Sequence, residues 1–225
     1  NVTSIGDGAF ANCDKLTSIE IPKSVTSIGE GAFAGCDKLT SIEIPSGVTN
    51  IGDVTFQDCS GLTSIEIPSS VTSIGESAFE SCTDLTNITI PKSVTSIGSN
   101  VFDGCTDLTE VLLEGGSTLS SEDFGEVANK VVTRWNEDNL TWTLTADGTL
   151  TISGTGAMKD YSYDSPACDN SNIKKVVIED GVTSIGSFAF WSCTSLTSIE
   201  IPSSVTSIGE NAFYNCTGLI SINIL

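Results

Sequence analysis

The sequence predicts a mainly β solenoid, in which short parallel strands stack coil upon coil. Cysteine recurs every 23 residues at Cys13, Cys36, Cys59, Cys82 and Cys105, and the spacing returns at Cys193 and Cys216. Phenylalanine keeps the same period from Phe10 to Phe102. Such a period is typical of a solenoid, because each unit is too small to bury its apolar face except against its neighbours.

Each repeat contains one predicted strand with the pattern Leu-x-x-Ile-x-Ile. In the repeat from Lys23 to Pro45 this strand runs from Leu39 to Ile44. Alternate residues of a strand point to opposite sides, so we expect Ile42 and Ile44 to face inward. The pattern, with Val or Leu allowed for Ile, begins at Leu16, Leu39, Leu62, Leu85, Leu108, Leu196 and Leu219. Successive strands should lie parallel, about 4.8 Å apart.

The rest of each repeat is predicted to close the coil. The proline that follows most of the strands removes a hydrogen-bond donor and ends the pairing, as at Pro45. Ile28-Gly29 and its equivalents are expected to form a turn before the Ala-Phe pair, which lies on the opposite wall.

After Leu113 the period weakens into a degenerate terminal repeat. Leu119 and Phe124 keep the five-residue spacing of Ile28 and Phe33, and Val127 stands where a cysteine would. Ser121-Glu122-Asp123 favours a short helix with serine at its N-cap, which would cover the exposed end of the first stack.

A β-hairpin is predicted next, from Thr141 to Ile152, because alternating residues flank Ala146-Asp147-Gly148. It should cap a second array that begins near Ile173. We therefore expect a first array at 1–135, a linker and hairpin cap at 136–172, and a truncated second array at 173–225. Because the chain starts at Asn1 and stops just after a repeat strand, we also expect it to be part of a longer one.

The repeat from Ile21 to Cys36 carries a specific resemblance. Ile21-Pro22-Lys23-Ser24-Val25-Thr26-Ser27-Ile28-Gly29-Glu30-Gly31-Ala32-Phe33-Ala34-Gly35-Cys36 resembles the BspA-like, or Treponema-type, leucine-rich repeats of bacterial surface proteins. Clear repeats cover about two thirds of the chain. The resemblance implies a leucine-rich-repeat solenoid that is secreted or held at the cell surface, and that takes part in adhesion to host or bacterial proteins.

Composition excludes several classes of function. The chain has 9 Lys plus Arg against 29 Asp plus Glu, so its formal net charge is −20, which disfavours nucleic acid and anionic membranes. Histidine is absent, which removes the commonest general base and metal ligand. No apolar run approaches the roughly 20 residues that span a bilayer. We expect no enzyme, no cofactor and no membrane insertion.

The cysteine column is predicted to be structural. Thiols stacked about 5 Å apart are too distant for disulfides, and no Cys-x-x-Cys pair or histidine supports a zinc site. Buried, inert thiols are the better interpretation. Cys168 lies off the column and is the candidate reactive thiol, although a buried place in the cap is the favoured alternative.

The outward side of the strands is the candidate binding face. One column contains Glu20, Glu43 and Glu66, then Thr89 and Leu112, and in the second array Glu200 and Asn223. A neighbouring column contains Ser18, Ser41, Ser64, Asn87 and Glu110, and alternation leaves its direction open. The stacked carboxylates would attract a cationic partner or Ca²⁺. A solvated face is the favoured alternative, because no Asp-x-Asp-x-Asp loop is present.

The sequence therefore predicts a non-enzymatic, extracellular or cell-surface binding scaffold. The partner would be a protein or glycan on a host or bacterial surface, bound through the strand-lined face by a monomer. The alternative is a structural spacer that holds another domain away from the cell.

Overall fold

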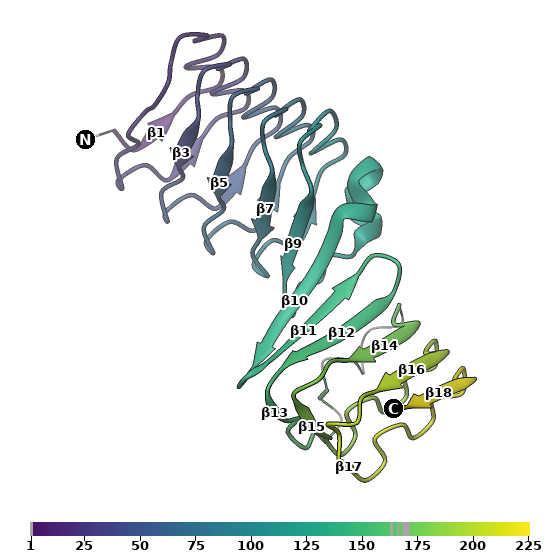
Figure 1. The fold of residues 1–225 in the computed structure, drawn as a ribbon. Helices are drawn as coiled ribbons and strands as arrows, with labels where there is room; N and C mark the ends of the chain where they lie inside the picture. The colour runs from purple at the N-terminus through teal and green to yellow at the C-terminus, as the bar shows by residue number, and fades with distance from the viewer. Residues whose placement is uncertain (1, 163, 166, 168–171) are drawn as a thin grey trace. The chain divides into compact units, whose positions relative to one another are not determined.

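The computed structural model describes residues 2–162, 164, 165, 167 and 172–225 (Figure 1). The chain forms two compact units, Asn1–Val132 and Thr133–Leu225. Each unit has its own hydrophobic core. The fold is a parallel β solenoid, as the 23-residue period predicts.

One wall of the first unit is built from the predicted Leu-x-x-Ile-x-Ile strands. These are β3 (Ser41–Glu43), β5 (Ser64–Glu66), β7 (Asn87–Ile90) and β9 (Glu110–Glu114). β3 pairs with β5 and β7 pairs with β9, both in parallel and in 23-residue register, with Ile42 opposite Ile65 and Ile88 opposite Val111. The copy that begins at Leu16 is an exception, because Ser18–Glu20 forms no strand.

The opposite wall carries a second parallel ladder that the sequence did not predict. It consists of a two-stranded sheet, β1 (Ser4–Ile5) and β2 (Ser27–Ile28), and a three-stranded sheet, β4 (Asn50–Ile51), β6 (Ser73–Ile74) and β8 (Ser96–Ile97). The expected turn at Ile28-Gly29 is therefore wrong for Ile28, which pairs with Ile5. Gly29 continues the ladder, since its N–H donates to the Ile5 carbonyl at 2.9 Å.

Columns of identical residues fill the space between the walls. The rings from Phe10 to Phe102 stack with centroids 5.4 to 5.6 Å apart. Four cysteines are buried beside them, and each of their thiols donates to a phenylalanine carbonyl one coil earlier, as Cys59 does to Phe33 at 3.1 Å; the four are Cys36, Cys59, Cys82 and Cys105. Burial raises the pKa of Cys59 to about 12, so this thiol stays protonated. The structural role predicted for the column is confirmed.

The degenerate repeat closes the first unit. Phe124 extends the aromatic column, with its ring 6.3 Å from that of Phe102, and Val127 is buried in the cysteine position. The predicted helix is a 3₁₀ helix, η1 (Ser121–Lys130), interrupted at Gly125, where φ is 51°. Its N-cap is Ser120 rather than Ser121, because the Asp123 carboxylate accepts a 2.7 Å hydrogen bond from the Ser120 N–H.

The second unit contains the predicted hairpin, which follows β10 (Val131–Glu137). Its strands β11 (Leu140–Thr145) and β12 (Thr149–Gly154) are antiparallel, with Leu144 opposite Leu150. The second strand then pairs in parallel with β14 (Lys175–Ile178), so the hairpin covers the start of the second array. The sheet order is β10 (Val131–Glu137), β11, β12, β14, β16 (Ser198–Ile201) and β18 (Ser221–Ile224). A second ladder joins β13 (Gly156–Ala157), β15 (Val182–Ile185) and β17 (Ser207–Ile208).

Candidate binding face

The strands β3, β5 and β7 present one polar surface, which we call the strand face. Their isoleucines are buried, whereas the residues on either side of Ile42 and Ile65 are exposed. Ser41 and Glu43 are two residues apart, so the pleat turns both to the same side. The serine column therefore faces outward with the glutamate column. The sequence had left open whether the serines point outward or inward.

Two adjacent hollows lie on the strand face. The first, of about 630 Å³, includes Ser41, Glu43, Ser64 and Glu66 in its lining. The second, of about 360 Å³, includes Ser64, Glu66, Asn87 and Thr89. The hollows share the β5 residues, so they form one groove that crosses three coils. Six of the nine predicted site residues line this groove.

Two carboxylates line each hollow: Glu43 and Glu66 the first, together with Lys23, and Glu66 and Glu114 the second. Glu43 and Glu66 are register partners on neighbouring strands. At a spacing of about 5 Å, two carboxylates repel by about 1 kcal/mol or less in water, and by about 3 kcal/mol at an effective dielectric constant near 20. Within the described residues neither glutamate forms an ion pair. Among the residues that the structure describes, these two carboxylates thus lack an ion-pair partner, although Lys23 lines the same hollow.

The other three predicted residues lie elsewhere. Ser18 and Glu20 are exposed, but they belong to the copy without a strand and line neither hollow. Glu200 is in the second unit, on β16, where its Oε1 atom lies 2.6 Å from the Lys175 Nζ atom. The structure therefore joins six of the predicted residues and separates these three from them.

The groove also has walls that sequence reasoning missed. Pro45 and Pro68, which lie two residues after the ends of β3 and β5, line the first hollow together with Lys23 and Ser46. Pro91 and Glu114 line the second. The proline that recurs after β3, β5 and β7 could have predicted these walls. A rigid residue repeated at one edge of a stack of strands lines that edge.

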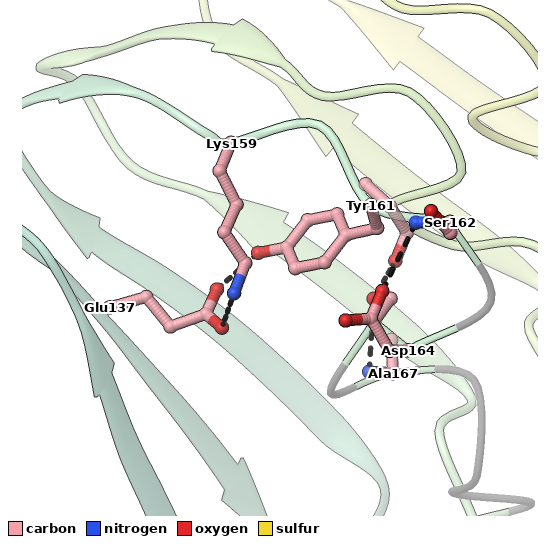
Figure 2. A network of polar contacts seen from close by, with 8 residues as sticks. Glu137, Lys159, Tyr161, Ser162, Asp164 and Ala167 are labelled. Atoms are coloured by element: carbon pink, nitrogen blue, oxygen red, sulfur yellow. Dashed lines mark hydrogen bonds and ion pairs between the residues drawn. The ribbon is translucent and has the colours of Figure 1, made fainter.

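A separate polar cluster in the second unit is structural (Figure 2). The Tyr161 hydroxyl donates to the Glu137 carboxylate, and the Lys159 Nζ atom lies 2.9 Å from Glu137 Oε1. Burial, followed by the hydrogen bond to Glu137, raises the pKa of Tyr161 far above its ordinary value. A phenol held protonated in this way is unsuited to act as a base or nucleophile. The cluster anchors the segment that contains Lys159 and Tyr161 to β10.

The described residues give little support for a metal site or a membrane-spanning helix. No group of three Asp, Glu or Cys side chains there is placed to hold a metal ion. Cys168, the candidate reactive thiol, lies outside the described residues. No helix in the part of the chain that the structure describes has the length and apolar character to cross a membrane.

Comparison with known proteins supports the repeat assignment. The family model described as BspA type leucine-rich repeat region matches residues 2–126 and 162–225, in six copies. The comparison with curated protein sequences gives no match.

Several solved structures are similar to the chain. A leucine-rich cell surface protein from Faecalibacterium prausnitzii is 28% identical, with 99% of this chain and 69% of that chain covered and a TM-score of 0.48. A leucine-rich repeat protein from Bacteroides ovatus is 27% identical, with coverage of 97% and 69% and a TM-score of 0.47. The leucine-rich repeat protein of T. pallidum is 23% identical, with coverage of 97% and 72% and a TM-score of 0.45.

Proposed function

Because the chain belongs to the BspA-type leucine-rich repeat family, we propose that it is a non-enzymatic binding scaffold whose strand face recognises a protein partner. Repeat proteins of this kind present extended surfaces, and recognition through such a surface needs no reactive group. The proposal includes an extracellular or cell-surface location and a role in adhesion.

The groove across β3, β5 and β7 is the observation that carries this proposal. Its strands are held by backbone pairing and by buried isoleucines, so the outward side chains contribute little to the stability of the coil. Ser41, Ser64 and Asn87 are exposed donors and acceptors at the start of successive strands. A rigid row of polar groups of this kind is preorganised for a partner, because little conformational entropy remains to be lost on binding.

A steric block tests the strand face without changing its charge. The immobilised chain would be used to capture proteins from host extracellular-matrix and bacterial-surface extracts, alongside the Ser64→Trp and Ser27→Trp variants. Ser64 begins β5 on the strand face, whereas Ser27 begins β2 on the opposite wall, and both are exposed. We expect Ser64→Trp to lose the captured partner and Ser27→Trp to retain it.

The controls separate folding from recognition. Urea midpoints of both variants should match that of the original chain, since each added indole projects from an exposed position. Equal capture by all three proteins would reject the strand face as the binding surface. Capture of no protein by any of them would favour the structural spacer.

A further inference from the structure

In the second unit, a lysine of the chain forms an ion pair with a residue of the glutamate column. Lys175 is the first residue of β14, and its ammonium group lies 2.6 Å from the Glu200 carboxylate of the next coil. The register pairs Lys175 with Ser198, and Val177 with Glu200. The lysine therefore reaches diagonally across one coil step, from the serine column to the glutamate column.

The equivalent positions of the first unit lack that cation. There the register pairs Ser41 with Ser64, and Glu43 with Glu66, so Ser41 corresponds to Lys175 and Glu66 to Glu200. A serine side chain is too short to reach the glutamate of the next coil. The space that a lysine fills in the second unit is part of the first hollow, which Ser41 and Glu66 both line.

The surroundings of the hollow suit a long basic side chain. Pro45 and Pro68 border it and offer apolar surface for a methylene stem, while Glu43 and Glu66 offer two acceptors for the charged end. Lys23 also lines the hollow, but within the described residues it forms no ion pair with either glutamate. Glu43 and Glu66 are therefore both available to an added cation, in competition with Lys23 at the edge of the hollow.

A side-chain cation agrees with this geometry better than a metal ion does. Ca²⁺ takes six to eight oxygen ligands, and no cluster of three acidic side chains occurs among the described residues. One ammonium or guanidinium group needs only one or two carboxylates. The repetition of the acceptors on neighbouring coils favours a basic segment over a single free ion.

We propose that the first hollow binds a Lys or Arg side chain presented by a basic polypeptide segment, the ammonium or guanidinium group pairing with Glu43 and Glu66. This inference rests on the proposed function, because it names the chemistry of the partner at the strand face. It also explains why the second unit, with Lys175 in place, offers no equivalent site at Glu200.

The test measures binding of a fluorescent oligolysine peptide to the full chain by anisotropy, with an oligoglutamine peptide as the neutral reference. The Glu43→Gln plus Glu66→Gln variant should bind oligolysine roughly tenfold more weakly, which corresponds to two exposed ion pairs. The matched control is Glu30→Gln plus Glu76→Gln, which removes the same charge from two exposed residues outside the groove. It should change the affinity by less than about twofold.

A third variant introduces a lysine of the chain itself beside Glu66. Ser41→Lys places an ammonium group at the position of Lys175, so it should pair with Glu66 and weaken oligolysine binding without loss of fold. Equal weakening by the two glutamine double variants would show diffuse attraction to an acidic surface and overturn the proposal. Calcium binding to the original chain that is lost in the Glu43→Gln plus Glu66→Gln variant would overturn it in favour of a metal site.

The outcomes also separate this inference from the proposed function. If Ser64→Trp abolishes capture of the protein partner while the glutamine variants leave both capture and oligolysine binding intact, the strand face is a binding surface but not one for basic segments. If Ser64→Trp leaves capture intact while Glu43→Gln plus Glu66→Gln loses oligolysine, the cation site exists but the natural partner binds elsewhere.

Discussion

At the residue scale, one left-handed backbone position recurs in the regular coils, two residues after the glycine that follows the short Ser-Ile or Asn-Ile strand. It is occupied by Gly31 with φ of 59°, by Val54 with φ of 50° and by Asn100 with φ of 56°. Glycine adopts this conformation freely and asparagine tolerates it, whereas a β-branched residue is strained there. The coil geometry therefore overrides the preference of valine, and Val54 is held in place by its neighbours.

Replacing Val54 with the residue found at position 100 should stabilise the protein. We expect Val54→Asn to raise the free energy of unfolding by about 1 kcal/mol, because relief of the strain exceeds the loss of a half-buried side chain. The matched control, Val54→Thr, stays β-branched and should give no gain. Urea denaturation would measure both, and a lower midpoint for Val54→Asn than for the original chain would contradict this account.

At the scale of the element, the glycine after some of the two-residue strands allows the previous coil to approach closely. A Cβ atom on Gly75 would lie 2.3 Å from the Asp53 Oδ1 atom and 2.6 Å from the Asp53 backbone nitrogen. The Asp53 carboxylate is itself engaged, since it accepts a 2.8 Å hydrogen bond from the Glu76 N–H. At Gly52 the nearest atom would be Glu30 Cγ at 3.4 Å, on a flexible side chain.

These two glycines should respond differently to the same substitution. Gly75→Ala is expected to lower the free energy of unfolding by about 2 to 3 kcal/mol, because the backbone of the previous coil must move. Gly52→Ala should change it by less than about 1 kcal/mol. Thermal or urea unfolding of the two variants would measure this, and similar losses at both sites would show that coil spacing is not limited by the glycine.

At the scale of the whole molecule, the repeat period places like charges beside one another. A residue that repeats every 23 positions lies next to its own copies, as Glu43 lies next to Glu66, so the net charge of −20 is arranged in columns. Self-repulsion of this kind keeps the protein soluble and also destabilises the folded state. The ion pair between Lys175 and Glu200 is a local exception.

Salt should therefore stabilise the protein. We expect the melting temperature to rise by a few degrees on going from low ionic strength to about 0.3 M NaCl, because the Debye length becomes comparable to the spacing between coils. The increase should be smaller for Glu43→Gln plus Glu66→Gln, which removes one repelling pair. Differential scanning calorimetry at several salt concentrations would measure it, and a fall in melting temperature would show that attractive pairs dominate instead.

Much of the fold could be predicted because each coil packs against copies of itself, so the residues of one repeat indicate its contacts with the next. The 23-residue period alone places Phe33 against Phe56 and Cys59 beside the Phe33 carbonyl, and the hairpin follows from Ala146-Asp147-Gly148. The second ladder was missed, because two residues such as Ser27–Ile28 are too few to show a strand pattern. The cluster of Glu137, Lys159 and Tyr161 was missed as well, since no period relates those residues.

The candidate site divides in the same way. The 23-residue period and the strand pleat place each residue beside its own copies. The amino-acid pattern was therefore enough to predict which serines and which glutamates lie next to one another in a column. Only the tertiary structure decided that Ser41, Glu43, Ser64 and Glu66 surround a hollow, whereas Glu200 is neutralised by Lys175. A hollow or an ion pair forms according to how far each side chain extends toward the next coil. The spacing of residues along the chain does not give that reach.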